Sequence, residues 1–415
     1  MYQRLATPLV FLRSFRAPPP RAMAQTVATY VIAASLLLLL YTYLGYPAIL
    51  WLTGRVRAQG LPVEDPEEWP TVSLTVPAYN EESQIRDLLE SLMAIDYPRD
   101  RLQLLIVSDA SSDETDDVVR EYADRGVDLL RMPERGGKTK AENAAAARLT
   151  GDIVINTDAS IRILPDSVKA LVRVFSDPTI GLASGRDISV GPDQESGNVG
   201  ESGYVGYEMA IRDLETRVSG IIGASGCFYA IRPHLHRIPL PESLSRDFAS
   251  ALHTRENGFR PVSVPGAVCL VPRSTSLRKE YRRKVRTITR GMETLAHKRA
   301  LLNPFRFGVF SWMLASHKIC RWALPWGAVA ALLALGVLAP TNAIAAALFS
   351  AGVLILVLAS IGWKHADRPG LSKFLSIPAF AVAGNLAAMH ALIRMLRGDQ
   401  DALWEPTRRE SITSA

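Results

Sequence analysis

Cysteine is scarce in this chain of 415 residues, and its scarcity excludes two classes of protein. The three cysteines, Cys227, Cys269 and Cys320, are far apart and form no CxxC pair. A disulfide framework and a zinc knuckle both need cysteines at characteristic close spacings. We therefore expect three thiols that serve neither as metal ligands nor as structural cross-links.

Charge is missing from three long windows. No Asp, Glu, Lys or Arg occurs in residues 22–54, 322–363 or 374–393. A helix needs about 20 apolar residues to cross a hydrocarbon layer about 30 Å thick, and Pro340 to Asn342 divides the middle window into two such helices. The sequence therefore predicts one membrane helix before a soluble region and about three after it. A cleaved signal peptide is the alternative for the first, but its apolar run is long and lacks a clear cleavage site.

These segments predict how the chain is organised. The central stretch is long enough for one catalytic domain, and the aromatic and basic residues that follow it are typical of a helix at the membrane interface. The predicted parts are a tail at 1–25, a membrane helix at 26–54, a catalytic domain at 55–303, an interfacial helix at 304–321, a membrane region at 322–397 and a tail at 398–415.

The first half of the soluble region alternates short apolar runs with helical patterns. This alternation predicts an α/β domain with a mostly parallel, Rossmann-like sheet, whose ligands bind beyond the carboxyl ends of the strands. We expect strands at 71–76, 102–107, 127–132 and 152–157, and helices near 82–95, 114–125 and 139–149.

Two carboxylates follow expected strands. Asp158, after the strand at 152–157, could coordinate Mg²⁺ or Mn²⁺ that bridges to a diphosphate, or could cap the turn before Pro165. Asp109 follows the strand at 102–107 and could bind a base or ribose. One such carboxylate means little, but two on neighbouring strands indicate a nucleotide site.

A glycine-rich GGKT segment at 136–139 resembles part of a phosphate-binding loop. The full pattern requires Gly at the position of Met132, so a P-loop is excluded. Lys138 could still reach a phosphate, or could be an exposed residue at the start of a helix. Farther along, Asp247 lies in the first turn of a helix expected from Ser245 to Asn257. There its carboxylate could stabilise the helix through the helix dipole, or it could act as a general base.

Positive charge is concentrated near the membrane segments. The net charge is +6, and residues 278–290 hold seven Lys or Arg against one Glu. Beside membrane helices, such a run favours anionic lipid headgroups or a phosphate-bearing substrate over nucleic acid. We expect no nucleic-acid partner.

Several motifs together resemble the membrane-bound branch of glycosyltransferase family 2, the inverting GT-A enzymes that include cellulose, chitin and hyaluronan synthases. The resemblance covers about residues 40–410 and rests on the order and spacing of its segments. They are YTYLGYP, PAYNEE, SDASSDET, GGKTKAENAAAARLTGDIVINTDAS, GASGCFYAIR, LSRDF, RKVRTITRG and WEPTRR.

The resemblance implies roles for individual residues. Asp247 would be the catalytic base and Arg286 the arginine of the family's Gln-x-x-Arg-Trp motif, while Asp158 would bind the metal. The nucleotide-sugar site would comprise Pro77, Tyr79, Asn80, Glu81, Asp109, Lys138 and Asp158.

This chain departs from the family pattern at several positions. Ser160 replaces the second Asp of Asp-x-Asp, and Ser245 and Arg246 replace Thr-Glu. Arg283 and Thr287 replace the Gln and Trp of the arginine motif. In the synthases that Trp helps to hold the growing polymer. Its absence here puts processive synthesis by this chain in doubt.

The expected function is inverting transfer of a sugar from a nucleotide-sugar, with UDP as the expected nucleotide, to a hydroxyl of a glycan or membrane-lipid acceptor. The alternatives are single-sugar transfer to a lipid carrier and a catalytically degraded nucleotide-binding scaffold. We expect a multi-pass inner-membrane protein with its catalytic domain in the cytosol. The four arginines before residue 22 then conflict with the positive-inside rule, unless translation begins at Met23.

Overall fold

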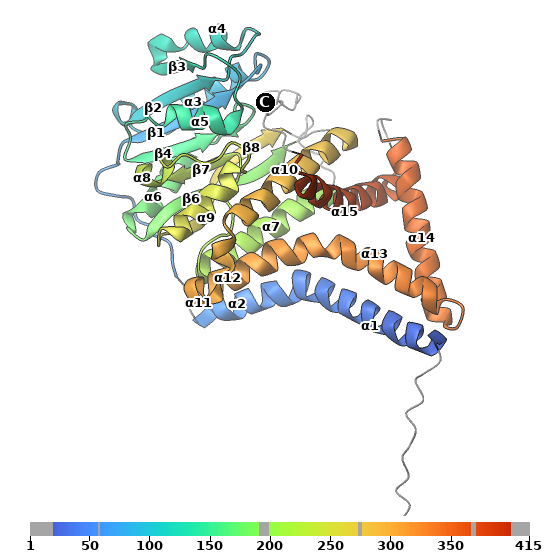
Figure 1. Cartoon of the computed structure of the whole chain (residues 1–415). Coiled ribbons are helices and arrows are strands. Elements are labelled where there is room, and N and C mark those ends of the chain that lie inside the picture. Colours follow the sequence, from blue (N-terminus) through green and yellow to red (C-terminus); the bar gives the residue numbers. More distant parts are fainter. Residues whose placement is uncertain (1–19, 57–58, 191–198, 273–275, 367–370, 400–415) are drawn as a thin grey trace, which may run out of the picture.

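A computed structural model describes residues 20–56, 59–190, 199–272, 276–366 and 371–399 (Figure 1). The described chain forms an α/β domain built around one sheet and a set of long apolar helices that extend from it. The tails at 1–19 and 400–415, which include WEPTRR, lie outside the described residues.

The central sheet has eight strands in the order β3-β2-β1-β4-β7-β6-β8-β5. The first four strands are parallel, as the sequence predicts, whereas β7 runs antiparallel to both of its neighbours. The strands are β1 (Val72–Ala78), β2 (Leu102–Ser108), β3 (Val127–Arg131), β4 (Ile153–Thr157), β5 (Arg162–Ile163), β6 (Ile180–Val190), β7 (Phe228–Ile231) and β8 (Arg260–Pro272).

Helices cover both faces of this sheet, because alternate residues of a strand point to opposite sides. In β2, Leu104 and Ile106 pack in one cluster with residues of α3 and α4. Leu105 and Val107 pack in a second cluster with α5. The helices of the domain are α3 (Ile85–Met93), α4 (Thr115–Arg120), α5 (Lys138–Ala145), α6 (Ser167–Arg173), α7 (Val199–Val218), α8 (Pro233–His236), α9 (Arg246–Glu256) and α10 (Leu277–His297).

Short 3₁₀ turns complete the connections of the domain. They occupy residues Arg99–Arg101, Ala123–Arg125, Val174–Ser176 and Arg299–Leu302. Helix α9 ends at Glu256, followed by Gly258 with a φ of 86°. A positive φ suits glycine, so this residue explains the predicted helix end.

Four helices in the part of the chain that the structure describes are long and apolar enough to cross a membrane. The first combines α1 (Pro20–Leu40), a π-helical turn at Tyr41–Gly45 and α2 (Tyr46–Val56). The second combines α12 (Val309–Leu314), a π-helical turn at Ala315–Cys320 and α13 (Arg321–Leu338). The third and fourth are α14 (Ala343–Lys364) and α15 (Lys373–Arg397), so one helix precedes and three follow the domain, as predicted.

The interfacial helix predicted at 304–321 corresponds to more than one helical piece in the structure. The structure has a four-residue helix, α11 (Pro304–Phe307), and then a continuous helical stretch from Val309 to Leu338. Gly308, with a φ of 56°, separates the two. No comparable break follows it, because the π-helical turn at Ala315–Cys320 continues directly into α13.

Helices α1 and α13 lie side by side and point away from the sheet (Figure 1). Their far ends meet where Gln25 Nε2 donates to Thr341 Oγ1 at 2.9 Å. Helix α15 instead packs along α10 and α14 (Figure 1). Helix α10 therefore links the α/β domain to the last apolar helix.

Candidate functional site

A polar cavity of about 280 Å³ lies where the carboxyl ends of the parallel strands meet α9 and α10. Its lining comes from the loop after β1, the start of α5, the loop after β4, strand β6, the loop before β7, and α9 and α10. Among the residues predicted for the site, it includes Glu81, Lys138, Asp158, Asp247 and Arg286.

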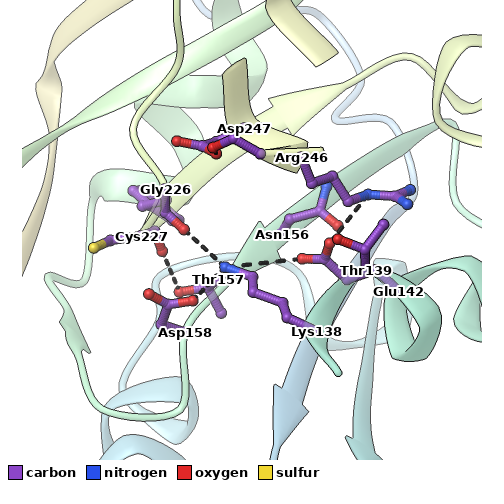
Figure 2. Close-up of polar contacts among 12 residues, drawn as sticks. Lys138, Thr139, Glu142, Asn156, Thr157, Asp158, Gly226, Cys227, Arg246 and Asp247 are labelled. Carbon is purple, nitrogen blue, oxygen red and sulfur yellow. Dashed lines mark hydrogen bonds and ion pairs between the residues drawn. The ribbon is translucent and has the colours of Figure 1, made fainter. Parts of the chain in front are cut away.

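Asp158 lies directly after β4, where the sequence predicts a carboxylate at the sheet edge. Its backbone N–H donates to Cys227 O at 3.3 Å, which ties this position to the segment before β7. The carboxylate is 24% exposed and forms an ion pair with the Lys138 ammonium (Figure 2). Asp158 is therefore an accessible anion in the cavity.

Lys138 joins three parts of the cavity. Besides Asp158, its ammonium donates to Gly226 O at 3.0 Å and lies 4.0 Å from Glu142 Oε1 (Figure 2). Burial by itself would lower the pKa of Lys138, but the two carboxylates outweigh it and raise the pKa above its usual value. The lysine therefore remains cationic at neutral pH, as a group that binds a diphosphate must.

Asp109 has a different environment from the other predicted acids. Its two oxygens accept the N–H groups of Gly136 and Gly137, each at 2.7 Å. The residue is only 2% exposed and does not line the cavity. Asp109 thus anchors the loop that presents Lys138, and direct contact with a nucleotide stays a prediction.

The loop after β1 contributes one predicted residue to the cavity lining, Glu81. Pro77 is buried inside β1, and Asn80, at a φ of 51°, accepts Ser112 N at 2.8 Å. The Tyr79 ring lies 3.9 Å beneath the Arg135 guanidinium. These three residues shape the loop beside the cavity.

Asp247 occupies the first turn of α9 and reaches the cavity from the side opposite Asp158 (Figure 2). Ser245 Oγ donates to Asp247 Oδ1 at 2.6 Å, so the serine orients the carboxylate and makes no side-chain cap of the helix. A Cβ on Gly226 would lie 3.3 Å from Asp247 Oδ2, a tight contact that explains the glycine.

Arg246, which replaces the expected acid beside Asp247, points away from it towards α5. Its Nε lies 3.1 Å from Glu142 Oε2, and both side chains are almost fully buried. Burial raises the pKa of Glu142, although the cations of Lys138 and Arg246 act against that rise. Sequence patterns did not identify this pair, because its members are over a hundred residues apart.

Helix α10 contributes a row of cavity residues at helical spacing, namely Arg283, Arg286, Thr287 and Arg290. Arg286 was predicted, and its neighbours follow from the helical period. Arg290 was missed, although it donates to the carbonyls of Glu242 at 2.7 Å and Leu244 at 2.6 Å. It fixes the loop that leads into Asp247.

Asp187 is a second cavity residue that sequence reasoning missed. It accepts a hydrogen bond from Ser225 Oγ at 2.5 Å, and burial raises the pKa of its carboxyl. It comes from the long strand β6, which the sequence pattern did not identify. Through the bond to Ser225, Asp187 holds the loop that carries Gly226.

The donor set is compatible with one kind of metal site. Among the described residues, no three His, Cys, Asp or Glu side chains are grouped closely enough to hold an ion by themselves. Mg²⁺ usually takes one or two protein carboxylates and completes its shell with water and substrate phosphates. Asp158, partly exposed in the cavity, fits that single-carboxylate pattern, with the Ser160 position in the same lining.

Comparison with known proteins agrees with this architecture. A family model described as "Glycosyl transferase family 2" matches residues 73–230, from β1 to β7. An N-acetylglucosaminyltransferase of Rhizobium sp. (strain N33) is 32% identical over 165 residues, 39% of this chain and 36% of that protein. A beta-monoglucosyldiacylglycerol synthase of Synechocystis sp. is 31% identical over 186 residues, 40% of this chain and 39% of that protein. The matches thus span under two fifths of either relative.

One solved structure resembles nearly the whole chain. It is the mannosyltransferase PcManGT from Pyrobaculum calidifontis in complex with GDP-Man and Mn²⁺, with a TM-score of 0.69 at 23% identity. The match covers 91% of this chain and 100% of that one. This likeness confirms the expected fold, a GT-A domain with attached apolar helices.

Proposed function

The chain carries a domain of glycosyl transferase family 2, and from this premise we propose that it moves a sugar from a nucleotide-sugar to a hydroxyl acceptor at a membrane. One observation carries the proposal. The Lys138–Asp158 pair and Asp247 line the same cavity, together with Arg286. A site for a diphosphate and a site for a base are therefore adjacent.

In this proposal Asp247 accepts the proton of the acceptor hydroxyl while that oxygen attacks the anomeric carbon. The bond from that carbon to the diphosphate breaks on the opposite face, so the configuration inverts. Ser245 keeps the carboxylate turned into the cavity through its 2.6 Å hydrogen bond. The base thus needs little rearrangement before the reaction.

Lys138 and Arg286 would bind the departing nucleoside diphosphate, because fixed cations stabilise negative charge where it develops. Asp158, with waters and the diphosphate oxygens, would hold Mg²⁺ or Mn²⁺, which when bound neutralises the same leaving group. A Mn²⁺ ion and GDP-Man accompany the structural neighbour, which supports this part of the proposal. UDP remains the nucleotide we expect.

The acceptor we propose is a membrane lipid or a lipid-linked glycan. Four membrane-length helices keep the cavity close to the bilayer, and the glycolipid synthase of Synechocystis sp. is among the relatives. Thr287 lines the cavity where the resemblance would require the Trp that holds a polymer. Single-sugar transfer therefore fits this site better than polymerisation, and the catalytic domain would face the cytosol, where nucleotide-sugars are made.

The test compares full-length wild type with Asp247→Asn in detergent, using a panel of nucleotide-sugars and membrane-lipid acceptors. We expect the variant to lose about a hundredfold to ten-thousandfold in kcat, the usual contribution of a positioned general base. Nucleotide binding, followed by calorimetry, should change little because Asp247 does not contact the diphosphate in this proposal. Product length, read from the same reactions, distinguishes one transfer from many.

Glu242→Gln is the matched control, because Glu242 is exposed and uses only its backbone carbonyl near the site. It should retain wild-type turnover. A folded Asp247→Asn protein that binds nucleotide and transfers sugar at the wild-type rate would refute the assignment of the base. Nucleotide binding without transfer by the wild type would favour the scaffold alternative.

A further inference from the structure

A second cavity lies at the foot of the first membrane helix, away from the site described above. It measures about 740 Å³ and is bounded by Val56 at the end of α2, Val218 and Ser219 at the end of α7, and Phe307 to Val309 before the second span. Gln59, Arg255 and Arg260 complete the lining. The first and the second of the membrane-length helices therefore each have one end beside this cavity.

The polar part of the lining can donate hydrogen bonds but carries no negative charge. Gln59, Ser219, Arg255 and Arg260 supply amide, hydroxyl and guanidinium donors, and the described residues of the lining include no Asp or Glu. A lining of this kind suits an anion, and two guanidinium groups suit the planar recognition of a phosphate.

The two arginines also lack full pairing. Arg255 lies over the Phe310 ring at 5.4 Å, and the described residues offer its guanidinium no hydrogen-bond or ion-pair partner. Arg260 Nη1 lies 3.5 Å from Asp177 Oδ2 and its Nη2 donates to Thr216 O at 3.5 Å, while its buried Nε has no hydrogen-bond partner among the described residues. Burial and then the Arg260 cation lower the pKa of Arg255, and an anion in the cavity would offset the repulsion between the two cations.

Exposed apolar residues belong to the cavity lining or adjoin it in the sequence. Val56 is 86% exposed and Phe305, in α11, is 98% exposed. The Arg55 guanidinium stacks 3.7 Å from the Trp51 ring one turn before the end of α2. Exposed aromatic and basic residues at the end of an apolar helix are typical of the lipid interface.

From this combination we propose that the cavity binds the phosphate group of an anionic phospholipid, with the acyl chains leaving past Val56 and Phe307. Arg255 and Arg260 bind the phosphate, and Gln59 and Ser219 bind headgroup oxygens. The site is independent of the proposed transfer reaction. It would hold an anionic lipid against the domain. Arg255 lies in the last turn of α9, the helix whose first turn contains Asp247.

The experiment measures lipid retention by native mass spectrometry of the full-length protein, titrated with phosphatidylglycerol or phosphatidylcholine in detergent. Wild type should bind phosphatidylglycerol more tightly, by about tenfold, because the choline cation of phosphatidylcholine would be repelled by the two guanidinium groups that bind its phosphate. Arg255→Gln should remove most of that preference. Arg306→Gln is the control, because Arg306 is an exposed cation of the same surface outside the lining.

A second pair of variants avoids any folding defect from the arginine change. Gln59 is exposed, so replacing it leaves the core intact. Gln59→Glu puts a negative charge into the cavity and should weaken phosphatidylglycerol binding about tenfold, while Gln59→Ala loses one neutral hydrogen bond and should weaken it less than about fivefold.

Three outcomes would overturn the proposal. They are equal binding of the two lipids by wild type, an unchanged preference in both Arg255→Gln and Gln59→Glu, and a loss of preference in Arg306→Gln as large as in Arg255→Gln. A parallel titration with glycerol 1-phosphate tests a soluble source. If it displaced phosphatidylglycerol at equal concentration, the ligand would be a free phosphate ester and the lipid proposal would be wrong.

Discussion

At the scale of single residues, buried side chains in this protein are stabilised by partners that are remote in sequence. His236, in α8, contacts Asn156 Oδ1 at 3.1 Å and lies 3.3 Å from Arg246 Nη2. Burial, followed by the cations of Arg246 and Arg237, lowers the pKa of His236 from 6.5 to about 3. The folded protein therefore holds this imidazole neutral.

This environment predicts an acid-sensitive contribution to stability. The unfolded chain binds a proton at His236 near pH 6.5, whereas the folded chain binds it only near pH 3. The free energy of unfolding is therefore unaffected above pH 6.5 and decreases as the pH falls between these two values. The loss is about 1.4 kcal/mol per pH unit. Between pH 7.5 and pH 5.5, the thermal midpoint of wild type should fall roughly 3–5 °C more than that of His236→Gln.

The matched control is His297→Gln, which removes an exposed histidine at the end of α10. It should keep the wild-type pH dependence. Thermal scans of the three proteins in one detergent measure the effect, and parallel falls in wild type and His236→Gln would contradict the assigned pKa.

Single residues also show which parts of the candidate site could be predicted from the sequence. The position of Asp158 could be predicted because it follows an apolar strand pattern, and that of Asp247 because it lies in the first turn of a helix pattern, while only the family resemblance assigned Asp247 its role as the base. The Glu142–Arg246 pair and the Asp187–Ser225 bond were not, because they depend on how α5, α9 and β6 are brought together. No local pattern encodes a partner that only tertiary packing supplies.

At the scale of elements, α10 connects the last apolar helix with the loop that precedes Asp247. Arg290 holds the backbone of the loop from Glu242 to Leu244 and reaches Thr139 Oγ1 at 3.3 Å. Since this loop leads into α9, Arg290 positions Asp247 without needing to contact the acceptor. Burial lowers the pKa of Arg290, and the nearby Asp247 carboxylate opposes that decrease.

We expect Arg290→Gln to lower kcat about tenfold to a hundredfold, because displacing a catalytic group by as little as about 1 Å can cost that much. Arg290→Lys should recover only part of the loss, since an ammonium cannot match the fixed geometry of a guanidinium that reaches several carbonyls. Arg282→Gln, an exposed change on the same helix, is the control. Turnover at saturating donor is the measurement, and wild-type kcat in Arg290→Gln would contradict the positioning role.

The strands of the sheet differ in how clearly the sequence pattern predicts them. Strands β1 to β4 are short apolar runs that alternate with helices, and each was predicted to within two residues of its ends. Strands β5 to β8 were not predicted. Strand β5 has only two residues, and β8 reads through two prolines, Pro261 and Pro265, a pattern that argues against a strand until its pairing with β6 is known.

At the scale of the whole molecule, the four apolar helices are not equivalent. Helices α1 and α13 extend away from the sheet and meet α14 at the turn that contains Thr341. Helix α15 runs along α10, where Lys284 lies 3.9 Å from the Phe380 ring and Tyr281 contacts His390 at 3.1 Å. In its most apolar 18-residue stretch 28% of the residues are buried, against 11% in the corresponding stretch of each of the other three.

This arrangement bears on the charges at the end of the last helix. Four complete crossings would carry Arg394 and Arg397, at the end of α15, to the side of the membrane opposite the catalytic domain, against the positive-inside rule. A helix that stays beside α10 keeps both arginines on the domain's side. We therefore expect α15 to return to the cytosolic face, although its length and composition would allow it to cross.

Cysteine labelling in intact cells tests this topology. In a background with Cys227 and Cys320 changed to Ser, Thr341→Cys should react with an impermeant maleimide added outside, because the turn lies at the far end of α1 and α13. Asp399→Cys, just after α15, should react only after permeabilisation, as should Glu67→Cys, an exposed position in the catalytic domain. Cys269 is buried and remains as an unreactive thiol. Labelling of Asp399→Cys from outside, with Glu67→Cys still protected, would mean that all four helices cross the bilayer and that the contact of α15 with α10 does not determine its topology.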